Sequence, residues 1–118
     1  MKGTLLIAAT LTLVSAEVGH AATLFTPMAR AESGSTLGCR AVNVTRKPLA
    51  ISIKRGDLNG VDSQSDCPNV APGAACPLLT PGPIIGYCRF DVEGGKKTIR
   101  AALTVEDSGG THLLIEAR

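Results

Sequence analysis

The sequence predicts a small all-β domain, an antiparallel β-sandwich of immunoglobulin-like type, with a small open β-barrel as the alternative. Apolar and polar residues alternate with a period of two in several short stretches, as in strands with one buried face. Gly, Pro and Asn separate these stretches, and no stretch beyond residue 22 has a convincing apolar period of 3.6 residues. Three parts are expected: a signal peptide over 1–22, a flexible N-terminal tail over 23–36 and a disulfide-stabilised β-domain over 37–118.

The first residues have the layout of a cleavable secretory signal peptide. Lys2 supplies one positive charge, and the uncharged apolar run of residues 5–14 is well short of the ~20 residues that cross a bilayer as a helix. Cleavage is expected after Ala22 or Ala21, with Val14-Ser15-Ala16 as a rival site. The mature protein is then one domain in size, secreted or periplasmic, and without an integral membrane segment.

The first strands are expected from Leu37 onward, because residues 23–36 show no sustained periodicity. Lys47-Pro48 separates the first strand from the second, since proline cannot donate a hydrogen bond to a ladder. Asn59-Gly60 predicts a two-residue hairpin turn of type I′. In the second strand, one face carries Leu49, Ile51, Ile53 and Arg55.

Three later runs, over 84–93, 98–106 and 113–115, are expected to form a three-stranded meander across residues 84–117. Glycine-rich segments, Gly94-Gly95 and Ser108-Gly109-Gly110, separate them. The inward residues of the first two runs are Ile84, Gly86, Cys88, Phe90, Val92, Ile99, Ala101, Leu103 and Val105, and in the last run Leu113 and Ile115 share one face.

The four cysteines are of two kinds. Cys39 and Cys88 lie in apolar strand-like stretches, whereas Cys67 and Cys76 flank a Pro/Gly-rich loop. Four cysteines allow three pairings, and the favoured one is Cys39–Cys88 with Cys67–Cys76, because core-facing and loop cysteines should each pair with their own kind. The two bonds would close loops of about 50 and about ten residues, worth ~4 and ~2.7 kcal/mol in the chain-entropy model.

Composition disfavours several classes of partner. The net charge is +2 and stays +2 without the leader, and the basic residues are spread along the sequence, which gives no electrostatic footprint for a nucleic acid or an anionic membrane. Aromatic content is 3%, with no Trp, so Tyr87 and Phe90 would have to form a sugar-stacking or base-stacking surface alone, and a polysaccharide-binding or single-strand-binding role is disfavoured. The cysteine spacing does not match a structural zinc site or a redox pair, and no cofactor or metal is expected.

Catalytic residues are not expected either. Beyond the leader His112 is the only histidine, and it is interpreted as a solvated residue at the start of a strand. Asp91 and Glu93 share the outward face of one run, where carboxylates are usually solvated. Residues 57–66 resemble a calcium loop, but three template positions fail, and turn chemistry is the better account. Asn43-Val44-Thr45 has the form of a glycosylation acceptor.

Three short segments carry a resemblance to a group of small, uncharacterised exported bacterial β-domain proteins. They are Cys39-Arg40-Ala41-Val42-Asn43-Val44, Tyr87-Cys88-Arg89-Phe90 and residues 99–105. The resemblance spans most of residues 37–117. It implies that Cys39 and Cys88 are the recurrent pair of the group and that the middle two cysteines are a local addition. It implies no activity, ligand or site residue.

The expected function is therefore that of an exported, non-enzymatic β-domain that acts through binding or as an envelope component. Its partner is unknown, with an envelope or extracellular protein as one possibility. The candidate feature is the loop 67–76, because a disulfide and prolines reduce the freedom that a loop loses on binding. Two alternatives are a protease-inhibitor-like module that presents this loop and a small exported hydrolase that uses His112.

Overall fold

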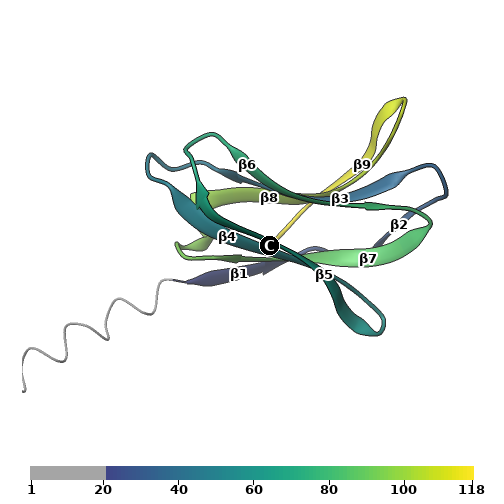
Figure 1. Cartoon of the computed structure of the whole chain (residues 1–118), viewed down its shortest axis with the longest axis horizontal. Coiled ribbons are helices and arrows are strands. Elements are labelled where there is room, and N and C mark those ends of the chain that lie inside the picture. The colour runs from purple at the N-terminus through teal and green to yellow at the C-terminus, as the bar shows by residue number, and fades with distance from the viewer. Residues whose placement is uncertain (1–20) are drawn as a thin grey trace, which may run out of the picture.

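Two antiparallel β-sheets pack face to face in the computed structural model, which describes residues 21–118 (Figure 1). The predicted β-sandwich class is confirmed. Apart from its last two residues, the predicted signal peptide lies outside the described residues. In chain order the elements are β1 (Ala22–Phe25), β2 (Ala29–Ala31), β3 (Thr36–Asn43), β4 (Leu49–Asp57), β5 (Gly60–Val70), β6 (Ala75–Pro81), β7 (Ile84–Val92), the 3-10 turn η2 (Lys96–Thr98), β8 (Ile99–Asp107) and β9 (Gly110–Glu116).

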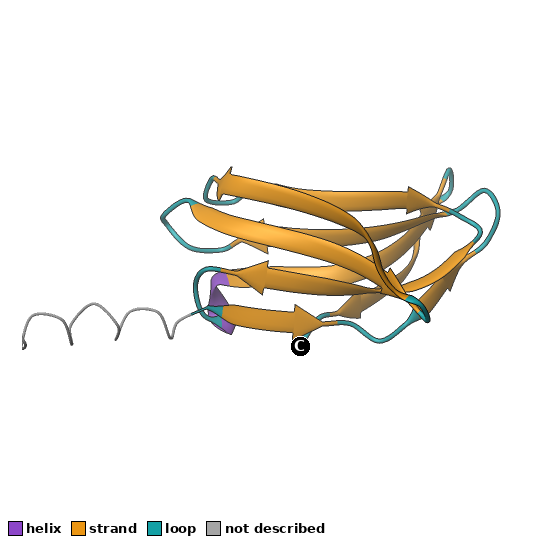
Figure 2. Cartoon of the chain, turned by 60° about the horizontal axis from the view of Figure 1, so that its bottom comes forward, coloured by secondary structure: helices purple, strands orange, loops and turns teal. Residues whose placement is uncertain are grey.

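The two sheets have different strand orders. The five-stranded sheet has the order β1-β7-β4-β5, and β2 pairs with β7 on the same edge as β1. The four-stranded sheet has the order β6-β3-β8-β9. β4–β5 and β8–β9 are hairpins, whereas the connections β2–β3, β3–β4, β5–β6, β6–β7 and β7–β8 cross between the two layers (Figure 2). No helix among the described residues is long and apolar enough to cross a membrane.

The meander expected over residues 84–117 is wrong, because β7 and β8 belong to different sheets. β7 is paired on one edge by β1 and β2 and on the other by β4, so it has no free edge for β8. The chain therefore leaves the sheet at Gly94-Gly95, turns through η2 and enters the other layer. The strands themselves and their buried faces are as predicted, including Phe90 and Leu103, which are fully buried.

The expected flexible tail over 23–36 is also wrong, since β1 and β2 are ordered strands on β7. Leu24 and Ala31 reach the core. Between them Thr26 continues the ladder: its N–H donates to the carbonyl of Cys88 at 3.0 Å, and its Oγ1 accepts from the N–H of Cys88 at 2.9 Å. Pro27 cannot donate, so the strand is interrupted there, which hides its periodicity in the sequence.

Both hairpin turns end on a glycine with positive φ. Gly60 has φ 112° and Gly110 has φ 115°, but no residue other than glycine has a positive φ in the described chain. The predicted hairpin at Asn59-Gly60 is therefore present but is not of type I′, which needs two such residues. Instead Leu58 and Asn59 form the turn and Gly60 pairs with Asp57, while the register shift lies further along, where Asp62 is the extra residue between Val61 and Ser63. The carboxylate of Asp57 supports it by accepting from the N–H of Asn59 at 2.7 Å.

Both disulfides link one sheet to the other. Cys39 on β3 is bonded to Cys88 on β7, with Cα atoms 5.7 Å apart. Cys67 on β5 is bonded to Cys76 on β6, with Cα atoms 6.0 Å apart. The favoured pairing is thus the one present in the structure. The first bond joins interior strands, and the second joins the two edge strands on one side of the sandwich.

Candidate functional site

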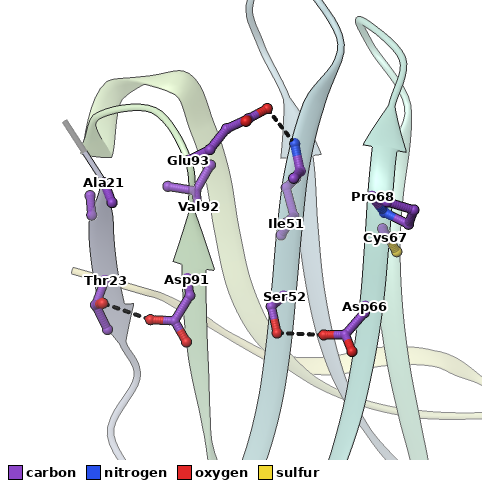
Figure 3. A pocket seen from close by; sticks show the side chains of 12 residues that line it. Ala21, Thr23, Ile51, Ser52, Asp66, Cys67, Pro68, Asp91, Val92 and Glu93 are labelled. Atoms are coloured by element: carbon purple, nitrogen blue, oxygen red, sulfur yellow. Dashed lines mark hydrogen bonds between the residues drawn. The ribbon is translucent and has the colours of Figure 1, made fainter. Parts of the chain in front are cut away.

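The outer face of the five-stranded sheet carries polar side chains in a row across four strands. Thr23 on β1 lies opposite Asp91 on β7, Asp91 lies opposite Ser52 on β4, and Ser52 lies opposite Asp66 on β5. Such opposed side chains face the same way, because neighbouring strands share one pleat. Thr23 Oγ1 donates to Asp91 Oδ1 at 2.6 Å, and Ser52 Oγ donates to Asp66 Oδ1 at 2.7 Å (Figure 3).

A second row adds cations to this face. Phe25, Arg89, Lys54 and Gln64 lie opposite one another in turn on the same four strands. Arg89 Nε lies 3.1 Å from Asp91 Oδ2, and Lys54 Nζ lies 3.7 Å from the same oxygen. The carboxylate of Asp91 therefore sits between two positive side chains.

Hydrogen bonds and a nearby positive charge keep Asp66, the second carboxylate of the first row, ionised. Gln64 Nε2 donates to both oxygens of Asp66, at 2.9 and 3.0 Å. Hydrogen bonds from Gln64 and Ser52, together with the charge of Lys54, hold the pKa of Asp66 below its ordinary value. The carboxylate of Asp66 is thus an acceptor at neutral pH.

An aromatic pair borders the two polar rows. Phe25 and Tyr87 have ring centroids 6.4 Å apart at 42°, and the guanidinium of Arg89 lies 5.8 Å from the Phe25 centroid. Tyr87 lies opposite Gly56 on β4, and a Cβ at Gly56 would collide with its ring. The glycine therefore lets the tyrosine ring lie across the sheet. We call these residues the polar–aromatic face: Thr23, Phe25, Ser52, Lys54, Gln64, Asp66, Tyr87, Arg89 and Asp91.

An open hollow of about 500 Å³ lies at one end of the polar–aromatic face, where Figure 3 shows its lining. Its floor contains the backbone of β1, β7, β4 and β5, and its walls include Pro68 and Glu93. Glu93 is not free to pair with Asp91, because its Oε1 accepts the N–H of Ala50 at 2.7 Å. The acid pair considered from the sequence, Asp91 and Glu93, is thus divided between separate partners.

The segment expected as a loop over 67–76 is mostly strand, which is a correction. Cys67 lies within β5, and Cys76 is the second residue of β6 and is fully buried. Only residues 71–74 connect the two strands. That connection is tied to β3: the N–H of Gly73 donates to the carbonyl of Asn43 at 2.8 Å, and the N–H of Asn43 donates to the carbonyl of Ala74 at 3.0 Å. The Cys67–Cys76 disulfide therefore clamps two sheets rather than a projecting loop.

His112 lies on β9 near the tip of the β8–β9 hairpin, with 56% of its side chain exposed. Its Nε2 lies 2.7 Å from Asp107 Oδ1, and this contact and the N–H of Gly109 hold the pKa of Asp107 below its ordinary value. Ser108 is in the same turn, but no hydrogen bond joins it to His112 in the described part of the chain. The histidine thus has an orienting carboxylate and no positioned nucleophile.

The calcium-like stretch 57–66 directs its acids to three different partners. Asp57 supports the hairpin turn, Asp62 Oδ1 lies 2.6 Å from Nη2 of the buried Arg55, and Asp66 belongs to the polar–aromatic face. Across residues 21–118 no group of three or more acidic, histidine or cysteine side chains is placed to hold a metal ion.

Asn43, the acceptor position of the glycosylation pattern, is fully buried. Its Nδ2 donates to the carbonyls of Lys47 and Val70 at 2.7 and 2.9 Å, and its Oδ1 accepts from the N–H and the hydroxyl of Thr45. The amide nitrogen that would carry a glycan is thus occupied in the folded domain, and the residue ties β3 to the β3–β4 turn and to β5.

Sequence reasoning missed Phe25, because it lies in the segment expected to be a tail. Phe90, one of the two aromatic residues considered for stacking, is fully buried, whereas Phe25 is 48% exposed beside Tyr87. Leu24 and Phe25 are adjacent and both apolar, so the short segment before Pro27 has no period-two alternation that would indicate a strand.

No protein-family model, curated protein or solved structure matches this chain. Its function has to be argued from the chemistry of its own surface.

Proposed function

We propose that this chain is an exported, non-enzymatic binding domain of the periplasm or the medium, and that it binds hydroxyl-rich polymers, such as glycan strands, through the polar–aromatic face. Export is supported by the signal-peptide pattern of residues 1–22 and by the two disulfides, which persist in oxidising compartments. A binding role is supported by the open sheet face and by the lack of a positioned nucleophile beside His112.

The observation that carries the proposal is the Phe25–Tyr87 pair, exposed at Phe25 and half-buried at Tyr87, beside two rows of hydrogen-bonding side chains. A sugar ring presents an apolar C–H face and a rim of hydroxyls. Aromatic rings cover such a face, while carboxylates accept from hydroxyls and Lys, Arg or Gln donate to them. The polar–aromatic face supplies both, in rows that a flat sheet extends over four strands.

The alternative of a protease inhibitor has less support. Its bait would be the connection of residues 71–74, which is short and hydrogen-bonded to Asn43 through Gly73 and Ala74. A bait must enter the cleft of a protease as an extended segment, and this turn lies back on β3 instead.

Tyr87 allows a direct test, since the chain has one Tyr and no Trp, so intrinsic fluorescence reports a single ring on the proposed surface. The oxidised protein is titrated with oligomers of N-acetylglucosamine, glucose and mannose, and binding to insoluble polysaccharides is measured by co-sedimentation. We expect a saturable change in tyrosine fluorescence with at least one oligomer. Phe25→Ala should weaken that binding by about 2- to 12-fold, because an aromatic contact contributes about 0.5–1.5 kcal/mol beyond its area.

Leu58→Ala is the matched control, because Leu58 is 87% exposed and lies in the β4–β5 turn outside the polar–aromatic face. It should leave binding unchanged. Equal affinity of Phe25→Ala and the parent protein, or failure of every polysaccharide to bind, would refute the proposed ligand class. Release of new reducing ends from a bound polysaccharide, lost in His112→Ala, would instead show that the domain is a hydrolase.

A further inference from the structure

Basic side chains from three parts of the chain line one groove on the outer side of the four-stranded sheet. Lys96 and Lys97 come from η2, Arg100 from β8 and Arg118 from the segment after β9, and the groove has a volume of about 870 Å³. We call it the basic groove. These residues are far from Arg40 in sequence, yet Arg40 on β3 lines the groove too.

Backbone hydrogen bonds bring these segments together. The N–H of Val44, just after β3, donates to the carbonyl of Thr98 in η2 at 3.0 Å. Phe25 and Arg118 exchange two hydrogen bonds, N–H to carbonyl in each direction, both of 2.9 Å. The β3 end and η2 are therefore joined to each other, and the chain after β9 is joined to β1. Residues of all these segments line the basic groove.

Most of the positive charge in the basic groove is not compensated. Arg40 contacts Glu106, with Nε 3.1 Å from Oε2 and Nη2 2.8 Å from the same oxygen. Hydrogen bonds from Thr104 and Arg40 hold the pKa of Glu106 below its ordinary value, so this pair is neutral overall.

The other four basic residues of the groove make no ion pair with any acid of residues 21–118, and Glu116 is the one acidic side chain of the lining. The whole chain has a net charge of only +2. The fold therefore adds Arg40 and Arg118 to Lys96, Lys97 and Arg100, which already lie within five residues of one another in the sequence.

The floor of the basic groove is apolar. Val42 and Ala102 lie on the outward face of β3 and β8, and they stand opposite Arg100 and Arg40 in the strand register. Leu114 on β9 is 61% exposed and completes this floor with Val44. An apolar floor under a cationic rim suits a ligand that has both an anionic and an aliphatic part, and the volume is in the range of small-ligand sites.

We propose that the basic groove binds the phosphate or carboxylate head of an amphipathic anion, with its aliphatic part over Val42, Val44 and Leu114. Guanidinium and ammonium groups donate charge-assisted hydrogen bonds to such a head. The same chemistry would come from a free amphiphile or from the headgroups of an anionic membrane. This site is on the sheet opposite to the polar–aromatic face, so it stands whether or not that face binds glycans.

The test uses the oxidised full chain and three probes: monomeric dodecyl phosphate, inorganic phosphate, and phosphatidylcholine vesicles with and without phosphatidylglycerol. Calorimetry measures the first two and co-sedimentation the third. Lys97→Gln/Arg100→Gln should bind dodecyl phosphate about 25-fold more weakly, from about 1 kcal/mol for each basic side chain at 1.4 kcal/mol per tenfold. Glu116→Gln, which removes the opposing charge, should bind about fivefold more tightly.

Arg30→Gln/Lys47→Gln is the matched control, because it removes two exposed positive charges that do not line the basic groove. All variants keep the same N-terminal residues, so any contribution of the apolar leader to vesicle binding cancels. Vesicle binding that needs phosphatidylglycerol and is lost in the groove variant, without binding of monomeric dodecyl phosphate, would assign the groove to lipid headgroups.

Three results would overturn the proposal. The first is no binding of any probe, and the second is equal loss in the groove and control variants. The third is affinity for inorganic phosphate as high as for dodecyl phosphate, because the apolar floor would then contribute nothing.

Discussion

The pairs Cys39→Ala/Cys88→Ala and Cys67→Ala/Cys76→Ala each remove one link between the same two sheets, and they differ in the loop that the link closes. The sequence separations are 49 and 9. In the chain-entropy model the two bonds lower the entropy of the unfolded chain by the equivalent of about 4 and about 2.7 kcal/mol. Their difference, about 1.4 kcal/mol, depends only on the ratio of the loop lengths, so the constant term of the model cancels.

The short loop lies inside the long one, which changes the expectation little. With Cys67–Cys76 closed, the path from Cys39 to Cys88 shortens from about 50 to about 41 residues, worth about 0.2 kcal/mol. The losses should therefore nearly add in the variant without both bonds. Burial acts in the same direction as loop length, because both sulfurs of the long bond are buried, whereas Cys67 is partly exposed.

Equilibrium unfolding in urea without reductant measures both losses. The midpoint should fall more for the long bond, and the slope m should rise in both variants, because the unfolded chains expose more surface. A domain of this size has a total stability of about 5–15 kcal/mol, so a loss of 4 kcal/mol is large. An equal or greater loss for Cys67→Ala/Cys76→Ala would refute the argument. The bond between the edge strands would then act mainly by holding the folded sheets together.

Three further predictions concern single side chains. Asn43→Ala should cost about 1–3 kcal/mol in urea unfolding, because it leaves the buried carbonyl of Val70 unpaired, whereas the neighbouring Val44→Ala, 48% exposed, should cost under about 0.5 kcal/mol; equal costs would contradict the role of the amide. Gly56→Ala should displace the ring of Tyr87, seen as a shift of tyrosine fluorescence and a loss of about 1–3 kcal/mol, and an unchanged spectrum would show that the ring does not depend on the glycine. The lowered pKa of Glu106 means that its ionised form stabilises the fold above its unfolded-state pKa and that this contribution is lost as the pH falls through the folded-state pKa. Glu106→Gln should thus be less stable than the parent protein at about pH 7, and the difference should shrink as the pH falls below the ordinary pKa of Glu; a pH-independent difference would exclude this linkage.

The sequence predicted the buried faces well, because they depend on a local period of two. Ile51, Ile53, Phe90 and Leu103 are all in the core as expected. Arg55 follows the same period of two: it lies on the face of β4 that carries Ile51 and Ile53, and it is only 4% exposed. Its partner, Asp62, lies in the stretch that resembles a calcium loop, so an inward cation explains one acid of that stretch better than a metal does.

The sheet in which each strand lies could not be predicted from the pattern. The turn at Gly94-Gly95 looks the same whether the next strand returns to β7 or crosses to the other sheet. The outcome depends on whether both edges of β7 are already paired. One edge is paired with β4 and the other with β1 and β2, two short strands that were not predicted from the sequence. Because β1 and β2 were not predicted, the predictions of a meander and of a flexible tail were both wrong.

The same reasoning applies to charge. Counting along the chain, the basic residues are dispersed, and dispersion was the ground for expecting no electrostatic surface. Antiparallel pairing places residues far apart in sequence at the same height of a sheet, as it does for Arg40 opposite Ala102, two residues from Arg100. The cross-sheet turn η2 then adds Lys96 and Lys97 at that end. Lys96, Lys97 and Arg100 are close in the sequence, but Arg40 and Arg118 join them only through the fold, so the charge pattern of an outer face depends on strand register as well as on spacing in the sequence.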